Sequence, residues 1–533
     1  MISEKRNIHN LVCESLGELN SKWKKYIKLL SNDLYDSNKI KKEDERHSIY
    51  ELWISQINAI KKGILNKDES FIIQMPTSAG KTFIAELFIL NKLINEPQKH
   101  VIYISPYKAL SSEKENELGK NIEKLGYSVS ILPGSYEVDF FFQDLFTVET
   151  DLLIATPEKI DLLLRTNKSY FNEVSTIIVD EGHIIGDDES RGLLLEFLII
   201  RVKVLYPDIK FLFISAVVSE DTAQELSTWL SNSNTNVITS IFNKKQWEPT
   251  HKLIGRFDWN VYNNYNGGTI TYDKVSFGNR QHPFIKNYLP PELNNTLLLD
   301  TTKAAITAAL SFKVVENGQT LIFCGTKRDL ESVSKRLLKL CKTLTNIKLI
   351  PDNNKASYFY SKEYFGEDNE ITQLMLYGIG IHNGKLPSQI RKSVEQDYKK
   401  NKLQMVICTN TIGQGINFPI KNLIIHSVSY GYGFSDLTNK DFWNIVGRAG
   451  RAEKETEGQI LYVIYKSPKY YSEEYPDEKN YKHYTNKQEY ETINSKLYNV
   501  YIDFLNKRIT DCGAFIRNNI RQNRYFFIRF NKY

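Results

Sequence analysis

Short apolar runs that alternate with longer helical segments are the feature of this sequence that most restricts its fold. In residues 51–240 the runs are Phe71–Ile73, Val101–Ile104, Leu152–Ala155, Ile177–Val179 and Phe211–Ile214. A second series, in residues 300–465, comprises Thr320–Phe323, Met405–Cys408, Leu423–His426 and Ile460–Ile464. Continuous apolar runs of this length are typical of strands buried on both faces, and strands that alternate with helices form parallel sheets. We therefore predict an α/β protein with two parallel-sheet domains.

The remaining segments differ in composition from the two predicted domains. Residues 1–50 are charged, with apolar side chains at helical spacing, and predict a helical N-terminal extension packed on the first domain. Residues 241–299 are rich in Asn, Tyr, Gly and Pro and predict a linker with a hairpin or small β insertion. Residues 342–370 predict a surface insertion in the second domain, and residues 466–533 a short C-terminal extension with weak helical patterning.

Composition excludes several other classes of protein. Of the 533 residues 41% are hydrophobic and 25% charged, which is typical of globular domains with large cores. The longest apolar runs are far shorter than the ~20 residues of a membrane helix. The five cysteines form no Cys-x-x-Cys pair, and an odd number argues against a disulfide framework or zinc site. We therefore expect a cytoplasmic protein without a signal peptide or membrane contact. The net charge of +6 does not by itself indicate nucleic-acid binding.

A phosphate-binding loop is predicted after the first strand of the first domain. The segment is Pro76-Thr77-Ser78-Ala79-Gly80-Lys81-Thr82, and a helical segment follows it. Small residues let backbone N–H groups close around phosphate, and the N-terminus of the helix attracts the anion. Lys81 would reach the β- and γ-phosphates, and the Thr82 hydroxyl would hold Mg²⁺. The alternative is a helix N-cap at Thr82 with a surface lysine.

Two adjacent carboxylates, Asp180 and Glu181, end the fourth predicted strand and precede Gly182 and His183. Neighbouring carboxylates repel each other, and a metal ion explains their position beside an apolar core. Asp180 would bind Mg²⁺ directly or through water, and Glu181 would orient and deprotonate an attacking water. The alternative is an exposed acidic turn.

Two arginines in the second domain complete the predicted ATP site. They belong to Gly447-Arg448-Ala449-Gly450-Arg451. In phosphoryl transfer an arginine from across a cleft neutralises charge on the γ-phosphate, an effect of roughly 10³–10⁵ in rate. The alternative is a basic surface turn.

The order and spacing of these three elements resemble those of the superfamily-two DExH-box helicases, most of all the Ski-type branch, over residues 51–465. The resemblance implies two tandem RecA-like domains that use ATP and Mg²⁺ to move along a nucleic acid from 3′ to 5′. Gln56 resembles the residue of the Q motif that reads adenine. Further nucleotide contacts are implied for Gly415, Asn417 and Asn444, and relatives usually carry Gln at the position of Asn444.

The resemblance also implies which residues contact the nucleic acid and which couple hydrolysis to movement. His183 and Ser215 would perform the coupling. Strand contacts go mostly to phosphate and sugar, so they position a strand without reading its sequence. For any single Thr or Lys, a helix cap or a solvated charge is the alternative. The implied contact residues are Pro106, Lys108, Gly134, Ser135, Thr156, Lys159, Thr326, Lys327, His382 and Thr409.

In Ski-type enzymes a strand-separating hairpin lies between the last two motifs, which here is the passage from Ser427 to Phe442. Its Tyr430, Tyr432 and Phe434 could stack on a base pair or pack on their own domain. Full-length Ski-type enzymes continue with a winged helix and a helical bundle, for which residues 466–533 are too few. We therefore expect either a segment of a longer chain or a compact motor that depends on a partner.

Three functions are compatible with these motifs. The first is a helicase or translocase on single-stranded or partly duplex nucleic acid, with DNA favoured and RNA as the alternative. The second is a nucleic-acid sensor that uses ATP only as a switch. The third is the motor subunit of an anti-phage defence complex, of which the bacterial Hachiman type is one example, where a protein effector subunit acts as partner.

Overall fold

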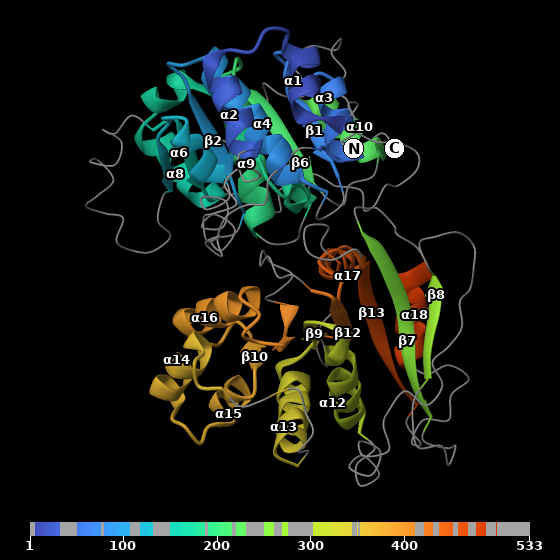
Figure 1. Cartoon of the computed structure of the whole chain (residues 1–533). Helices are drawn as coiled ribbons and strands as arrows, with labels where there is room; N and C mark the ends of the chain where they lie inside the picture. The colour runs from blue at the N-terminus through green and yellow to red at the C-terminus, as the bar shows by residue number, and fades with distance from the viewer. Residues whose placement is uncertain are drawn as a thin grey trace, which may run out of the picture. The chain divides into compact units, whose positions relative to one another are not determined.

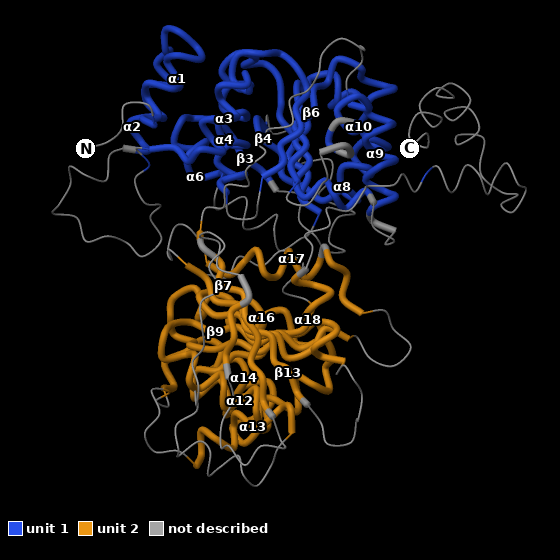
Figure 2. The backbone as a smooth tube through the Cα atoms, turned by 90° about the vertical axis from the view of Figure 1, so that its right-hand side faces the viewer, with its two compact units in different colours: residues 1–247, 490–533 blue, residues 248–489 orange. Residues whose placement is uncertain are grey.

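A computed structural model of the chain describes residues 6–31, 49, 51–75, 79–106, 118–131, 150–186, 190–215, 220–230, 250–260, 269–274, 302–343, 349, 352–410, 420–429, 436–450, 457–466, 476–486 and 497. The chain divides into two compact units, which Figure 2 distinguishes by colour. The first unit comprises residues 1–247 and 490–533, and the second comprises residues 248–489.

Six parallel strands form the sheet of the first unit (Figure 1). They are β1 (Phe71–Gln74), β2 (His100–Ile104), β3 (Val129–Ile131), β4 (Leu152–Ala155), β5 (Val174–Val179) and β6 (Lys210–Ser215). All five strands predicted for this domain are confirmed, and their apolar side chains are buried because neighbouring elements cover both faces of the sheet. The three-residue strand β3 was not predicted, since its central Ser130 interrupts the apolar run.

The strand order is β1-β6-β5-β2-β4-β3, which places β1, β6 and β5 side by side. Gln74 pairs with Ser215, and Val179 with Phe213. Because the carboxyl ends of parallel strands lie at one edge of a sheet, the loops that follow these three strands meet there. The phosphate loop, the acidic pair and the Ser215 motif therefore share one edge.

Eight helices and two 3₁₀ turns are described in the first unit. They are α1 (Ile8–Leu16), α2 (Ser21–Ser31), α3 (Ile54–Lys61), α4 (Lys81–Asn95), α6 (Lys120–Lys124), α8 (Pro157–Thr166), α9 (Ser190–Leu205), α10 (Glu220–Leu230), η4 (Ser169–Glu173) and η5 (Gly182–Gly186). Every side chain of α4 from Phe83 to Leu93 is buried. Strands β2 and β5 of the sheet contact α4, and helix α3 also packs against α4.

The N-terminal helix α2 contributes to the same core. Trp23 and Tyr26 are buried in it, and the Tyr26 hydroxyl donates a hydrogen bond of 2.8 Å to Oε1 of Glu86 on α4. Asn121 Nδ2 donates to the same oxygen at 2.9 Å. A buried carboxylate needs such donors, because its transfer out of water is otherwise costly. The first fifty residues therefore supply a partner that the interior of the first unit requires.

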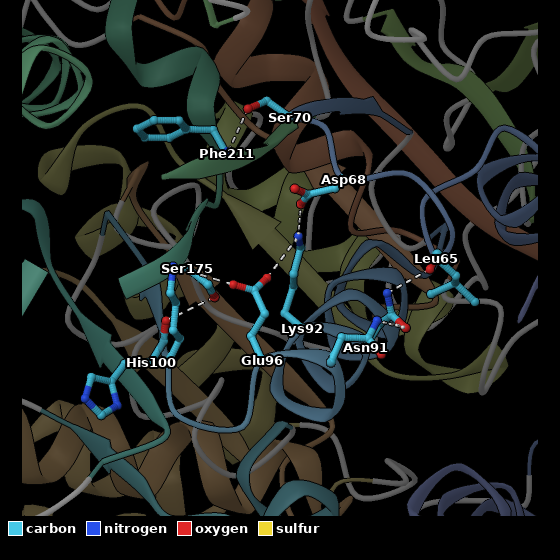
Figure 3. A network of polar contacts seen from close by, with 11 residues as sticks. Leu65, Asp68, Ser70, Asn91, Lys92, Glu96, His100, Ser175 and Phe211 are labelled. Atoms are coloured by element: carbon cyan, nitrogen blue, oxygen red, sulfur yellow. Dashed lines mark hydrogen bonds and ion pairs between the residues drawn. The ribbon is translucent and has the colours of Figure 1, made fainter. Parts of the chain in front are cut away.

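The far end of α4 carries two more buried polar side chains, whose partners Figure 3 shows. Lys92 Nζ lies 2.5 Å from Asp68 Oδ1 and 3.5 Å from Glu96 Oε1. The hydrogen bond from Lys92 holds the pKa of Asp68 below its usual value. Asn91 Nδ2 donates to the carbonyl of Leu65 at 2.8 Å. These bonds fix the segment between α3 and β1, which leads into the phosphate loop.

Seven strands form the sheet of the second unit, in the order β10-β11-β9-β12-β13-β7-β8. They are β7 (His251–Asn260), β8 (Thr269–Lys274), β9 (Thr320–Phe323), β10 (Ile379–His382), β11 (Met405–Cys408), β12 (Asn422–Ile425) and β13 (Glu457–Lys466). All pairs are parallel except β7 with β8 at the edge. The four strands predicted for this domain are confirmed.

The second unit has seven described helices and one 3₁₀ turn. They are α12 (Lys303–Val314), η6 (Val315–Asn317), α13 (Lys327–Thr343), α14 (Ala356–Phe365), α15 (Glu370–Leu376), α16 (Ser388–Lys399), α17 (Asn439–Val446) and α18 (Pro476–Asn486). None of the helices in the described ranges of either unit has the length and apolar character to cross a membrane.

Two segments of the second unit differ from expectation. The hairpin predicted in residues 241–299 is confirmed by β7 and β8, which pair as antiparallel neighbours, but it extends the main sheet through β13. The prediction of a surface insertion is wrong for α14, because this helix packs against α15 and α16 and buries Tyr358 in the core. Its apolar period is obscured by buried serines, Ser357 and Ser361, which resemble surface residues in a sequence.

Replacing Trp23 with Ala should lower the free energy of unfolding of the first unit by about 3–5 kcal/mol, as for other buried tryptophans. The reason is that Trp23 is buried in the core that α2 shares with α4. Urea denaturation followed by circular dichroism measures the change. The exposed Lys25 of the same helix is the control, and Lys25→Ala should change stability by less than about 0.5 kcal/mol. Equal effects of the two substitutions would contradict an integral role for α2.

Candidate nucleotide and nucleic-acid site

The described part of the phosphate loop is held by its neighbours on both sides. Met75 N–H donates to the carbonyl of Ser215 at 3.1 Å, which ties the end of β1 to β6. Gly80 precedes α4 with φ of 82°, in the left-handed region that favours glycine. Ala79 is fully buried, whereas Thr77 and Ser78 lie outside the described residues.

Residues of helix α3 contact this loop as well. The Ser55 hydroxyl donates to the carbonyl of Ala79 at 3.1 Å, and Gln56 Oε1 accepts a hydrogen bond from Trp53 N–H at 2.9 Å. A Cβ atom on Gly80 would lie 2.1 Å from Gln56 Nε2. Gln56 is therefore packed on the phosphate loop, and only glycine fits at position 80 beneath it.

The acidic pair lies at the end of β5. Asp180 is 5% exposed, and both of its carboxylate oxygens accept hydrogen bonds. Oδ2 accepts from the Tyr103 hydroxyl at 2.7 Å, and Oδ1 accepts from Glu181 N–H at 2.9 Å. Glu181 has φ of 48°, a conformation that costs a non-glycine residue about 1–2 kcal/mol. Strain of this kind is typical of functional sites.

His183 connects the acidic pair to the end of β6. Its Nδ1 lies 3.2 Å from Ser215 Oγ and 3.4 Å from Glu181 Oε2. Gly182 allows this arrangement, because a Cβ atom there would lie 2.1 Å from the ring of Phe213. The two residues predicted to couple hydrolysis to movement are thus in contact with each other, and His183 also contacts the predicted base.

The residues at this edge fit ATP with Mg²⁺. Among the described residues, the buried Lys81 Nζ and the buried Glu181 Oε2 have no hydrogen-bond partner. Buried polar groups normally form hydrogen bonds, so these two atoms are suited to bind a ligand. Thr82 follows Lys81 at the start of α4, where a hydroxyl and a helix N-terminus can bind an anion. Lys81 supplies a cation for phosphate, and Asp180 and Thr82 supply the oxygen atoms that Mg²⁺ prefers.

In the second unit, the predicted arginine segment follows α17. Asn444 and Arg448 are both half-buried. Gly450, with φ of 69°, donates its N–H to the carbonyl of Ile420 at 2.8 Å, and a Cβ atom there would lie 2.7 Å from the backbone N of Gly458. This close approach fixes the turn that carries Arg448. Arg451, Gly415 and Asn417 lie outside the described residues.

Three of the predicted strand-contact residues of the first unit are described. Pro106 is buried directly after β2, and Thr156 is the buried N-cap residue of α8. Lys159 is half-buried in the first turn of that helix. Lys108, Gly134 and Ser135 lie outside the described residues.

The predicted strand contacts of the second unit have structural partners. Thr326 Oγ1 accepts from Asp329 N–H at 3.0 Å and so caps α13, and the exposed Lys327 lies 3.4 Å from Glu331. His382 is 1% exposed, with Nε2 3.0 Å from Glu395 Oε1, and its carbonyl accepts from Thr409 N–H at 3.3 Å. The His382 side chain is thus buried against Glu395, whereas its carbonyl is bonded to the backbone of Thr409.

The two arms of the predicted hairpin pair with each other. Ser429 and Asp436 form an antiparallel bridge, and Leu437 N–H donates to the carbonyl of Val428 at 2.9 Å. Tyr430, Tyr432 and Phe434 lie outside the described residues.

The base of this hairpin is anchored on β9 and α13. Gly325 N–H donates to Ser427 Oγ at 2.9 Å, and the Ser427 hydroxyl donates to Asp329 Oδ2 at 2.7 Å. A Cβ atom on Gly325 would lie 2.2 Å from the carbonyl oxygen of Ser429. Close backbone contact therefore joins the hairpin base to the end of β9.

Sequence reasoning missed Tyr103 and Ser55 as parts of the site. Tyr103 lies within an apolar run that predicts only a buried strand, and Ser55 lies at the start of a helix, where serine is common. Neither position carries a local sequence signal for its partner.

Comparison with known proteins agrees with this geometry. The model of the DEAD/DEAH box helicase domain matches residues 54–226, and the model of the helicase conserved C-terminal domain matches residues 341–453. The first covers the phosphate loop and the acidic pair, and the second covers the segment that carries Arg448. The chain belongs to the superfamily-two helicases.

Individual relatives come from two groups. The Hachiman protein HamB of Bacillus cereus is 31% identical over 468 residues, which are 83% of this chain and 39% of that protein. The ATP-dependent DNA helicase Hel308 of Methanococcus vannielii is 28% identical over 419 residues, 77% of this chain and 51% of that protein. Hel308 of Pyrococcus abyssi is 28% identical over 434 residues, which cover 81% of this chain and 53% of that protein. The chain thus spans between 39% and 53% of the length of these relatives.

Replacing Gly80 with Ala should reduce both stability and nucleotide affinity, because the new methyl group must displace Gln56. Gly126 is a matched control with φ of 87° and no atom within 4 Å of its Cβ position. Both substitutions should cost about 1–2 kcal/mol of backbone strain. Only Gly80→Ala should add about 1–3 kcal/mol for the displaced side chain. Urea denaturation and titration with a fluorescent ADP analogue measure the two effects, and identical behaviour of the variants would contradict the packing of Gln56 on the loop.

Proposed function

We propose that this chain is the ATP-hydrolysing motor of a helicase that moves along single-stranded DNA from 3′ to 5′. The observation that carries the proposal is a pair of buried atoms beside Asp180, Lys81 Nζ and Glu181 Oε2, that have no hydrogen-bond partner among the described residues. A protein that only bound nucleic acid would have no use for this arrangement.

Each residue of the site has a distinct role in this proposal. Lys81 would bind the β- and γ-phosphate oxygens, and Glu181 would take the proton of the water that attacks the γ-phosphorus. The bond between the γ-phosphorus and its bridging oxygen then breaks, and ADP and phosphate leave. Mg²⁺, held by Thr82 and Asp180, would neutralise phosphate charge.

The second unit would complete the reaction and grip the strand. Arg448 and Arg451 would neutralise charge on the γ-phosphate, and Asn444, Gly415 and Asn417 would contact the nucleotide, as the motifs of the family imply. Gln56 would bind adenine. The strand contacts would come from the first-unit segments at Pro106, Lys108, Gly134, Ser135, Thr156 and Lys159, and from Thr326, Lys327 and Thr409.

DNA is favoured over RNA because relatives with 28% identity are named ATP-dependent DNA helicases. The motifs hold phosphate and sugar, and selection between the two polymers depends on contacts with the 2′-hydroxyl. Membership of the Ski-type branch remains part of the proposal.

A second candidate is more specific about the biological setting. The 31% identity with a Hachiman protein favours a motor subunit of an anti-phage defence complex in the bacterial cytoplasm, where a protein effector would act as partner. A sensor that used ATP only as a switch would not need a strained Glu181 next to Asp180.

Steady-state ATPase assays without nucleic acid, with single-stranded DNA and with single-stranded RNA test the proposal. We expect stimulation by DNA, and a loss of at least about 100-fold in Lys81→Ala and in Glu181→Gln, because these remove the phosphate cation and the general base. Wild-type turnover in either variant would refute the site. Stimulation by RNA alone would refute the choice of DNA.

The hairpin has its own test. Replacing Tyr432 and Phe434 together with Ala should reduce duplex unwinding by about tenfold or more, since aromatic stacking contributes ~1–3 kcal/mol per base. Strand-stimulated ATPase should be spared. Tyr364→Ala, at an exposed tyrosine of α14, is the control. Equal loss of unwinding and ATPase would contradict a strand-separating role.

A further inference from the structure

Tyr103 is a buried tyrosine in the middle of the first sheet. It lies on β2 with no exposed surface, and its hydroxyl donates a 2.7 Å hydrogen bond to Asp180 Oδ2. Its neighbours on the strand, Ile102 and Ile104, are purely apolar. A branched aliphatic side chain would suit this strand position at least as well, and a buried hydroxyl is costly unless it is bonded. The hydroxyl of Tyr103 therefore contributes mainly through its hydrogen bond to Asp180.

The strand pairing leaves this contact little freedom. Tyr103 is paired with Ile178 of β5 and Ile104 with Val179, and Asp180 N–H donates to the carbonyl of Ile104 at 3.0 Å. The Asp180 backbone is therefore fixed against β2. Hydrogen bonds then orient the carboxylate, because Oδ2 accepts from the Tyr103 hydroxyl and Oδ1 accepts from Glu181 N–H.

We propose that Tyr103 is a positioning residue for the divalent cation of the ATP site, acting through Asp180. This inference rests on the proposed function. Carboxylates that bind metal ions are commonly held by hydrogen bonds from neighbouring groups, and removal of such a partner typically costs 10–100-fold in metal affinity. The Tyr103 hydroxyl holds the Asp180 carboxylate in one orientation, and a phenylalanine in its place would keep the ring packing and remove this hydrogen bond.

The strand β2 also continues directly into Ser105 and Pro106, the segment for which strand contacts are predicted. Ser105 is fully buried, and its N–H donates to the carbonyl of Ala155 at 2.9 Å. Tyr103 therefore lies two residues from a predicted strand-contact segment while its hydroxyl reaches the metal-binding carboxylate.

The test is a Mg²⁺ titration of the binding of a fluorescent ADP analogue to the full chain, wild type and Tyr103→Phe. We expect the half-saturating Mg²⁺ concentration to rise by about 10–100-fold in Tyr103→Phe. Affinity for the analogue in excess EDTA should stay unchanged, because Lys81 and the phosphate loop are not altered. Bound Mn²⁺, counted by electron paramagnetic resonance in the presence of ADP, should fall in parallel.

Tyr26→Phe is a matched control. It removes a buried tyrosine hydroxyl that donates to a carboxylate at 2.8 Å in the same unit, but this carboxylate, Glu86, is not a predicted metal ligand. Both variants should show a similar fall in thermal unfolding midpoint, and only Tyr103→Phe should shift the Mg²⁺ titration. An unshifted titration in Tyr103→Phe, or an equal shift in both, would overturn the inference. Absence of Mg²⁺-dependent nucleotide binding in the wild type would instead refute the proposed function, and this inference with it.

Discussion

Three charged side chains, Lys81, Asp180 and Glu181, lie at the carboxyl edge of an apolar sheet. Removing charged groups from water costs free energy, and the surrounding elements of the first unit compensate for part of this cost. Charged groups at the edge of a core are tolerated only when donors, acceptors or ligands compensate for lost water. Asp180 has its compensation within the protein, from a tyrosine and a backbone N–H. Lys81 Nζ has no hydrogen-bond partner among the described residues, and Glu181 Oε2 has only the His183 ring at 3.4 Å. The same edge is thus held in place by hydrogen bonds at Asp180, whereas Lys81 is buried beside it without one.

The helix α4, which follows the phosphate loop, is buried between the sheet of the first unit and the helices that precede β1. A helix whose side chains are buried all round cannot fold by itself against one face of a sheet, and it must be covered on its other sides. Its buried polar groups then become points of attachment: Glu86 to Tyr26, Asn91 to Leu65 and Lys92 to Asp68. The segments before β1 are consequently a structural part of the unit that carries the predicted phosphate loop.

Much of the fold could be predicted from the sequence because parallel strands buried on both faces appear as continuous apolar runs, as in Leu152–Ala155 and Met405–Cys408. The strands that do not appear as continuous apolar runs break that pattern: β3 is short, β10 contains Gly380, and β7 mixes charged with apolar residues. The motif residues stood out because charged and small residues follow apolar runs. Tyr103 could not be found, since its bond to Asp180 joins residues 77 positions apart and depends on the register of two strands.

The base of the hairpin in the second unit has a mechanical consequence. Any force applied to residues 430–435 enters the protein through the paired arms, at Ser429 and Asp436. From there it passes through Ser427 to Gly325 at the end of β9 and to Asp329 in the first turn of α13. Both bonds run through the short Ser427 side chain, and the close backbone approach of Gly325 to Ser429 lies beside them. The segment that joins the two arms is therefore attached to the sheet of the second unit at two elements, β9 and α13.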